Sequence, residues 1–195
     1  MDDVKVREKK EALLDLAGIE GESIVDGPGI RFAVFCQGCP HGCEGCHNPA
    51  THPFGTGTKV APSRLLQEID KDPLLRGVTF SGGEPFCQAG AFLELGRGVK
   101  ERGLDIVIFT GYRYEELLEL SGYDMDGNKA DDSAQGTEWA TPDEIKGLLD
   151  ICDILIDGRF ILAQRDLTLQ FRGSQNQRLI DMNKTREAGE VVLWG

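Results

Sequence analysis

Four of the six cysteines of this 195-residue chain lie within eleven residues, in the segment FCQGCPHGCEGCHNPA at 35–50. Cys39, Cys43 and Cys46 have the spacing C-x3-C-x2-C, and Cys36 adds a C-x2-C pair in front of them. Thiolates on one short loop can bind a single soft metal centre, and the glycines between them let the backbone fold tightly. The sequence therefore predicts a metal site in this segment.

Three kinds of site are compatible with this spacing. Four thiolates can close a tetrahedral zinc site, although zinc ribbons place a longer segment between their two cysteine pairs. Four thiolates can also hold an iron–sulfur cluster, but the ferredoxin pattern C-x2-C-x2-C-x3-C-P is not reproduced. In the third arrangement Cys39, Cys43 and Cys46 hold a [4Fe–4S] cluster with one iron left open, and Cys36 belongs to the preceding strand. The spacing alone leaves all three open.

The composition narrows the class of protein. The 33 acidic and 21 basic residues give a net charge of -12, which disfavours binding to nucleic acid. No apolar run of about 18 residues is present to span a membrane, and the N-terminal residues do not have the pattern of a secretory signal. We therefore expect a cytoplasmic protein, in which clustered cysteines bind metal more often than they form disulfides. Cys87 and Cys152 stand apart and are expected to be buried, apolar-like thiols.

The rest of the chain alternates between strand and helix patterns. Strands are predicted at 31–35, 77–80, 104–110 and 152–157. Helices are predicted at 62–69, 89–102, 113–120 and 142–151. Thr141 is expected to cap the last helix, and Gly96 and Gly98 to weaken the second by up to about 1 kcal/mol each.

This alternation predicts an α/β fold of parallel βαβ units in one domain. A full eight-unit barrel needs about 250 residues, so we expect a partial barrel or an open sheet. Residues 121–141 are polar and acidic, which indicates an exposed loop inserted in the domain. This loop is partly similar to a calcium-binding loop, but Lys129 and Gln135 stand where such a loop requires Gly and Glu. A solvated insertion is the preferred interpretation.

Six short motifs, in order along residues 25–178, carry a resemblance to a known family. They are VDGPGIR, CPHGCEGCHN, SGGEP, FTGY, DILIDGRF and FRGSQNQR. The three-cysteine motif followed by a GGE at a strand end resembles the radical S-adenosylmethionine (SAM) enzymes. The complete set is similar to the activating proteins of anaerobic, glycyl-radical ribonucleoside-triphosphate reductases, which implies a partial βα barrel with a mostly parallel sheet. The acidic loop and the C-terminal extension after residue 180 lie outside the resemblance.

The resemblance implies an enzyme, a radical SAM oxidoreductase that activates a glycyl-radical enzyme. Cys39, Cys43 and Cys46 would bind a [4Fe–4S] cluster, and SAM would chelate the open iron. An electron from the reduced cluster would cleave SAM, and the resulting 5′-deoxyadenosyl radical would take a hydrogen atom from a backbone glycine. The protein substrate would be the anaerobic reductase, and a flavodoxin-like protein would supply the electron.

The resemblance also carries SAM contacts over to this sequence. Gly82 and Gly83 would let backbone groups approach the methionine end of SAM, and Glu84 would accept from its ammonium. His47 would line the adenine, and Thr110 would contact the ribose or the methionine. Gly45 stands where many radical SAM enzymes have an aromatic residue, a departure that these activating proteins tolerate. The implied cofactor-binding set is Gly45, Cys46, His47, Gly82, Gly83, Glu84 and Thr110.

Other charged residues of the motifs have two interpretations each. Asp157 and Arg159 lie at a strand end, where they can contact a ligand or form a structural ion pair. Asp26 and Arg31 flank a Gly-Pro-Gly sequence that predicts a tight turn, and contact with a partner is the alternative. A solvated polar face or contact with SAM or the reductase is open for Arg172, Asn176 and Arg178.

Three other functions stay open at this point. The chain is also compatible with an activase of a different glycyl-radical enzyme, or with a radical SAM enzyme for a small molecule. A non-catalytic zinc or iron–sulfur module belongs to a different class. Zinc without sulfide in the purified protein would favour that module, whereas cleavage of SAM would favour an enzyme.

Overall fold

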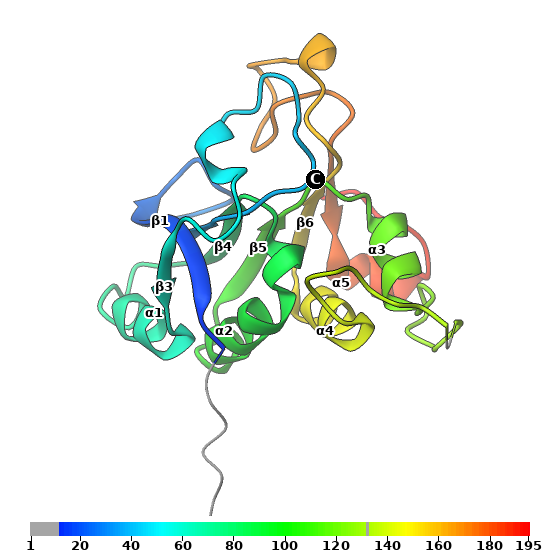
Figure 1. The fold of residues 1–195 in the computed structure, drawn as a ribbon, viewed down its shortest axis with the longest axis horizontal. Coiled ribbons are helices and arrows are strands. Elements are labelled where there is room, and N and C mark those ends of the chain that lie inside the picture. Colours follow the sequence, from blue (N-terminus) through cyan, green and yellow to red (C-terminus); the bar gives the residue numbers. More distant parts are fainter. Residues whose placement is uncertain (1–11, 132) are drawn as a thin grey trace, which may run out of the picture.

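A computed structural model describes residues 12–131 and 133–195, which form a seven-stranded sheet with helices packed on it (Figure 1). The strands are β1 (Leu14–Ser23), β2 (Arg31–Cys36), β3 (Thr58–Val60), β4 (Gly77–Gly82), β5 (Asp105–Phe109), β6 (Ile154–Asp157) and β7 (Arg178–Asp181). The α-helices are α1 (Pro62–Ile69), α2 (Ala89–Glu101), α3 (Tyr114–Ser121), α4 (Pro142–Ile151) and α5 (Met182–Ala188). Short 3-10 helices are η1 (Pro49–Thr51), η2 (Pro85–Gln88) and η3 (Leu162–Gln164).

The sheet is mixed, and its strand order is β3-β1-β2-β4-β5-β6-β7. The central strands β2, β4, β5 and β6 are parallel to one another. At one edge β1 pairs antiparallel with β2 and β3, and at the other edge β7 pairs antiparallel with β6. The predicted α/β class with parallel βαβ units is therefore confirmed, whereas the antiparallel edges and α5 have no counterpart in the sequence-based prediction.

The sequence motifs meet at the carboxyl ends of the parallel strands. The C-x3-C-x2-C motif follows β2, SGGEP begins with the last two residues of β4, TGY follows β5 and DGRF begins with the last residue of β6. In the register of the sheet Cys36 lies opposite Gly82, and Phe109 lies opposite Ile156. Figure 1 shows the loops after β2 (cyan) and after β6 (orange) rising together above this edge. Segments far apart in sequence thus border one region, where α/β folds bind ligands.

The predicted helices are all present, and α1 and α4 have the predicted bounds. Helix α4 begins as expected, because Thr141 Oγ1 accepts from Glu144 N and the Glu144 carboxylate accepts from Thr141 N. These reciprocal hydrogen bonds form a capping box, which satisfies N–H groups that have no partner within the helix.

Helix α2 forms in spite of Gly96 and Gly98, and the structure gives the reason. A Cβ at Gly96 would lie 2.2 Å from Ile151 Cδ1 at the end of α4. A Cβ at Gly98 would lie 2.5 Å from Leu66 Cδ1 of α1. The two glycines therefore allow α2 to pack closely against both helices, and the apolar contacts offset the propensity cost.

The acidic segment 121–141 is a mostly exposed loop, as predicted. Apart from residue 132, it holds turns and one isolated bridge between Tyr123 and Lys129. Near its end, Trp139 stacks on Phe54 with ring centroids 4.9 Å apart and planes inclined by 5°. This stack joins the loop to the chain that follows the cysteines.

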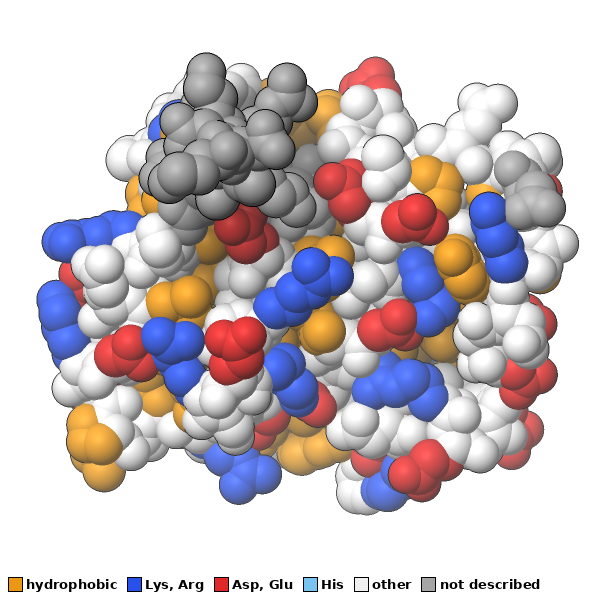
Figure 2. Space-filling model, turned by 90° about the horizontal axis from the view of Figure 1, so that it is seen from below, with side chains coloured by type: hydrophobic (Ala, Val, Ile, Leu, Met, Phe, Trp, Pro, Cys, Tyr) orange, Lys and Arg blue, Asp and Glu red, His pale blue; other side chains and the backbone are white. Residues whose placement is uncertain are grey.

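The face seen from below in Figure 2 carries acidic side chains interspersed with basic ones. At the amino ends of the parallel strands, Arg76 pairs with Asp105 at 2.8 Å and Lys100 pairs with Asp153 at 2.7 Å. Part of the negative charge is thus balanced locally. Within the described residues, every helix is too short or too polar to cross a membrane.

Candidate functional site

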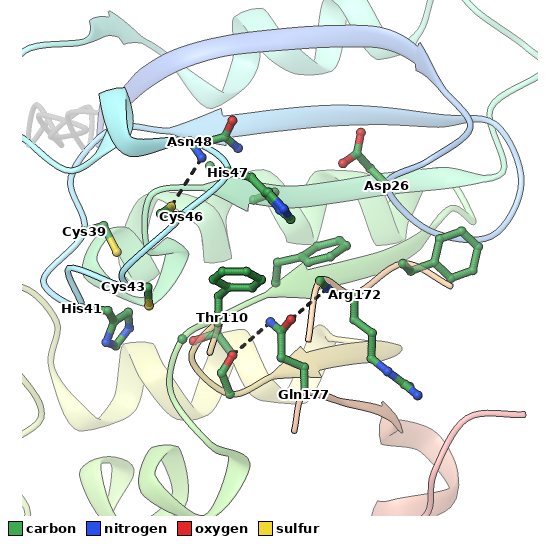
Figure 3. A pocket seen from close by; sticks show the side chains of 18 of the residues that line it. Asp26, Cys39, His41, Cys43, Cys46, His47, Asn48, Thr110, Arg172 and Gln177 are labelled. Atoms are coloured by element: carbon green, nitrogen blue, oxygen red, sulfur yellow. Dashed lines mark hydrogen bonds between the residues drawn. The ribbon is translucent and has the colours of Figure 1, made fainter. Parts of the chain in front are cut away.

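The cysteine loop, defined here as residues 37–57, leaves the end of β2 and returns to β3. Backbone hydrogen bonds close it on itself, since Cys39 N donates to His52 O at 3.1 Å and Cys46 N donates to Cys43 O at 3.2 Å. The side chains of Cys39, Cys43 and Cys46 are half-buried and form no disulfide. Figure 3 shows them together along one side of a cavity.

This cavity has a volume of about 390 Å³, which lies in the range of small-molecule sites. Its walls come from the cysteine loop, the ends of β4 and β5, and the loop after β6. The predicted site residues that line it are Cys39, Cys43, Cys46, His47, Gly82, Gly83 and Thr110. Gly45 and Glu84 are not among the lining residues. Gly45 instead has a positive φ of 72°, and a Cβ there would lie 2.9 Å from Leu162 Cδ1 of η3.

Burial acts on the thiol of Cys39. It raises the pKa of Cys39 to about 11, although a hydrogen bond from the His41 N–H opposes the shift. A thiol with this pKa is protonated at neutral pH in the metal-free protein. Binding of a metal at Cys39 therefore displaces a proton.

The other three cysteines are buried away from the cavity. Cys36 and Cys152 are 0% exposed and Cys87 is 6% exposed, and burial raises the pKa of each thiol. The prediction of buried thiols at Cys87 and Cys152 is therefore confirmed. Cys36 is the last residue of β2 and packs in the apolar core, which is the location expected if it is a strand residue.

Gly82 and Gly83 lie against the start of the cysteine loop. Gly82 has a φ of 96°, and a Cβ there would lie 2.6 Å from Cys36 N. A Cβ at Gly83 would lie 2.2 Å from Gly38 O. These glycines allow β4 to approach the loop backbone, and they line the cavity as well. Their predicted contact with SAM stays a prediction.

Glu84 lies beneath the cavity and is 0% exposed. Its carboxylate accepts hydrogen bonds from the Phe86 and Gly111 N–H groups and from the Thr110 hydroxyl, and it contacts His41. Glu84 therefore connects β4, the end of β5 and the cysteine loop. Its predicted contact with the ammonium of SAM stays a prediction.

Asp157 takes part in an ion pair, but its partner is not the predicted Arg159. Asp157 is 1% exposed, and it binds Arg178 through both carboxylate oxygens. Arg178 also binds Glu115 of α3 through two hydrogen bonds of 2.9 and 2.8 Å. Hydrogen bonds with the two carboxylates raise the pKa of Arg178. The network ties β6, β7 and α3 together, so the interpretation of Arg178 as part of a solvated face is wrong.

The side chain of Arg31 stabilises the Gly-Pro-Gly turn that precedes β2. This side chain is 0% exposed and donates to Pro28 O at 3.1 Å, to Val78 O at 2.8 Å and to Thr79 Oγ1 at 2.6 Å. Arg31 is thus structural. Asp26 lies on the cavity wall, and its carboxylate accepts from the Ser23 hydroxyl at 2.5 Å.

The FRGSQNQR segment forms the far wall of the cavity, and Gln177 shapes it. Gln177 Oε1 accepts from Gly173 N at 3.0 Å, and its Nε2 donates to Gly158 O at 3.1 Å (Figure 3). Phe171 has a φ of 58°, a left-handed conformation that is strained for a bulky residue. Arg172 also lines the cavity, and its buried Nε has no hydrogen-bond partner among the described residues.

Several lining residues were not identified from the sequence. Gln177 has no spacing signal of its own. The apolar side chains that line the cavity carry no local signal either, because they read as ordinary loop residues; they are Val25, Phe160, Leu167, Leu169 and Phe171. His47 lines the cavity, with its ring 5.1 Å from that of Phe160. Its predicted contact with the adenine of SAM stays a prediction.

Comparisons with known proteins show the family to which the chain belongs. The family described as "4Fe-4S single cluster domain" matches residues 25–180. The anaerobic ribonucleoside-triphosphate reductase-activating protein of Vibrio cholerae is 35% identical over 163 residues, 79% of this chain and 89% of that protein. Its counterpart in Escherichia coli K12 is 30% identical and covers 79% of this chain and 90% of that protein. The pyruvate formate-lyase-activating enzyme of Clostridium pasteurianum is 38% identical over 128 residues, 57% of this chain and 54% of that enzyme.

The chain belongs to the family of anaerobic ribonucleoside-triphosphate reductase-activating proteins. This activating protein is therefore a radical SAM enzyme, and its cofactors are a [4Fe–4S] cluster and SAM. The alternative of a zinc module is excluded by this membership.

The cavity of the activating protein fits these cofactors. Its three lining cysteines can supply one thiolate to each of three irons, and the remaining volume is bordered by glycines and by the His47 and Phe160 rings. Among the described residues, no three His, Cys, Asp or Glu side chains converge as they would around one metal ion. A four-iron cluster does not require such convergence, because each thiolate binds a different iron.

Proposed function

We propose that this activating protein generates a glycyl radical on an anaerobic ribonucleoside-triphosphate reductase. The observation that carries the proposal is that the three thiols with the C-x3-C-x2-C spacing and the strand ends expected to bind SAM line the same cavity. The relatives named for this reaction cover most of the chain. When bound, the reduced cluster and SAM supply the one-electron chemistry that removes a hydrogen atom from a substrate glycine.

The residues of the cavity have separate tasks in this proposal. Cys39, Cys43 and Cys46 hold the cluster and leave one iron free for SAM. Gly82 and Gly83 present backbone groups to the methionine end of SAM, because no side chain stands between the backbone and the cavity. Thr110 lies beside them at the end of β5.

The part of the cavity lined by His47 and Phe160 would receive the nucleoside of SAM. His47 and Phe160 offer flat rings there, and Gly173 leaves them room, since a Cβ at Gly173 would lie 2.9 Å from His47 Cε1. Gly45 lies behind this wall and lets η3 approach the cysteine loop. The loop after β6 adds the apolar side chains of Phe160, Leu167 and Leu169 to the lining of the cavity.

The fold, partner and location have further proposed features. The sheet is an incomplete βα barrel, which is supported by a parallel centre whose two edge strands, β3 and β7, are not paired with each other. A flavodoxin-like protein donates the electron, as the resemblance implies. The cytoplasm is the proposed location, and the six unpaired cysteines support it.

A second candidate is the activation of another glycyl-radical enzyme. It is favoured by the pyruvate formate-lyase-activating enzyme of Clostridium pasteurianum, which has the higher identity of 38% over a shorter match of 128 residues. The two candidates share one chemistry and differ in the protein that carries the glycine.

The test is to mix the anaerobically reconstituted protein with SAM, a reductant and either an anaerobic reductase or pyruvate formate-lyase. We expect 5′-deoxyadenosine in both mixtures and a glycyl-radical signal in electron paramagnetic resonance (EPR) only with the reductase. The Cys43→Ala variant is the control and should give neither product. A glycyl-radical signal only with the lyase would favour the second candidate, and no cleavage of SAM would refute both.

A further inference from the structure

The carboxylate of Glu84 has no free acceptor position. Its Oε1 accepts from Phe86 N at 3.0 Å and from Thr110 Oγ1 at 2.9 Å. Its Oε2 accepts from Gly111 N at 2.8 Å and lies 2.8 Å from His41 Nε2. A carboxylate has about four acceptor sites, so these groups occupy it. Because the carboxylate only accepts, His41 Nε2 carries the hydrogen of their bond.

His41 is the residue of the cysteine loop that reaches this carboxylate. It stands two residues after Cys39 and two before Cys43, and its side chain is 4% exposed. Its ring packs edge-on against Tyr112, with centroids 4.6 Å apart. A Cβ at Gly111 would lie 2.2 Å from His41 Cδ2, so the glycine of the TGY motif makes room for the histidine.

Other anchors of the cysteine loop lie at its two ends. Gly38 N donates to Thr51 O at 2.8 Å, and Gly38 O accepts from Glu84 N at 2.8 Å. The part of the loop from Cys39 to Cys43 is joined to the sheet by the side chain of His41. A buried hydrogen bond between a carboxylate and an imidazole is stronger than one between neutral groups.

We infer that Glu84 is a positioning residue, which acts through His41 to hold residues 39–43 of the cysteine loop so that their thiolates face the cavity. In this role Glu84 supports the loop that binds the cluster and makes no direct contact with SAM. The inference rests on the proposed function only in taking Cys39, Cys43 and Cys46 as the ligands of the cluster.

A double-mutant cycle tests this inference on the reconstituted protein. The variants are Glu84→Gln, His41→Ala and the two combined, and iron release to a chelator is measured for each. We expect both single variants to release iron about 10- to 100-fold faster than the parent, as when a residue that orients a metal ligand is lost. The double variant should release iron no faster than the faster single variant, because the two residues act as a unit. Multiplying effects would overturn the inference.

Binding of SAM separates this role from direct contact. In the cluster-loaded fraction of Glu84→Gln and His41→Ala, we expect the SAM dissociation constant to change less than about threefold. We also expect the EPR spectrum of the reduced cluster to change alike in both. A rise of more than about tenfold in the dissociation constant of Glu84→Gln, with unchanged iron release, would show direct contact with the ammonium and refute the inference.

Two further variants control for misfolding and for a general effect of removing a carboxylate. His41→Gln keeps an N–H donor near the position of Nε2, so it should release iron at nearly the parental rate. If Glu84→Gln does not fold, the comparison of His41→Gln with His41→Ala tests the inference in its place. Glu144→Gln changes a capping carboxylate of α4 and should have no effect on iron release. None of these measurements uses the reductase, so they stand if the reductase is not the substrate, whereas a parent protein without iron and sulfide would refute the proposed function itself.

Discussion

Replacement of Cys36 by alanine separates packing from metal binding in the cysteine segment. Cys36 is 0% exposed, lies opposite Leu16 and Gly82 in the sheet, and belongs to the apolar core. It does not line the cavity that Cys39 borders. We therefore expect Cys36→Ala to lose stability and to keep the cluster.

The loss of stability follows from the size of the group removed. A thiol is close to a methylene in size, and its transfer from the core contributes about 0.8 kcal/mol. The residual cavity adds a similar amount because a packed core relaxes only in part. The total is about 1–2 kcal/mol, which lowers the melting temperature of a domain of this length by about 2–8 °C.

The assay combines thermal unfolding of the metal-free protein with iron and sulfide analysis after anaerobic reconstitution. Cys36→Ala should melt earlier and bind the parental amounts of iron and sulfide. Cys43→Ala is the matched control, because its half-buried thiol contributes little to packing, and it should melt near the parental temperature without a stable cluster. If folded Cys36→Ala contained no iron and sulfide, four thiolates would be used and the three-cysteine site would be wrong.

Three other changes are expected to have measurable effects. Gly83→Ala should lose most of its iron on reconstitution, because its Cβ would lie 2.2 Å from Gly38 O, whereas Gly21→Ala, with nothing within 4 Å, should not; equal iron in both would show that the close approach is unimportant. Arg178→Met leaves the buried Asp157 without its ion partner and should lower the free energy of unfolding by about 3 kcal/mol in urea titrations, and a change below about 0.5 kcal/mol would contradict the role of this network. Glu115→Gln tests how the stability contributed by the Arg178 network depends on pH. The hydrogen bond from Arg178 lowers the pKa of Glu115 from 4.5. The stabilisation from the ionised Glu115 is therefore full above pH 4.5 and is lost as the pH falls through the lowered pKa. The variant should show a shallower loss of unfolding free energy below pH 4.5, and an unchanged dependence on pH would refute this.

Elements with local signals were predicted well from the sequence. Helices α1 and α4 begin with proline, α4 has its capping box, and the apolar strands β4, β5 and β6 are bounded by glycine or polar residues. The antiparallel strands have weaker signals. β1 contains Gly18 and Gly21 and is buried mainly at its ends, while β3 and β7 have three and four residues. Their pairing depends on neighbours that are distant in sequence, which no local pattern reports.

The residues of the site were likewise predicted only where they carry a local signal. The cysteine spacing and the GGE and TGY motifs predicted where the cavity lies, because parallel strands bring their carboxyl ends to one edge. The side-chain contacts of Glu84 were not predicted, since they join residues 43 and 26 positions apart. The ion pair of Asp157 was expected with the neighbouring Arg159 and is made with Arg178, because β7 lies beside β6 in the sheet.

The register between β2 and β4 couples the fold to the site. Cys36 lies opposite Gly82. The chain then turns so that Gly83 lies against Gly38 and the Glu84 carboxylate contacts His41. A slip by one residue would reverse the faces of β4, place a side chain against the base of the cysteine loop and move the carboxylate away from its donors. Substitutions that disturb this strand pairing should therefore reduce cluster binding even where they lie far from the cysteines, while changes at the antiparallel edge strand β3 should not.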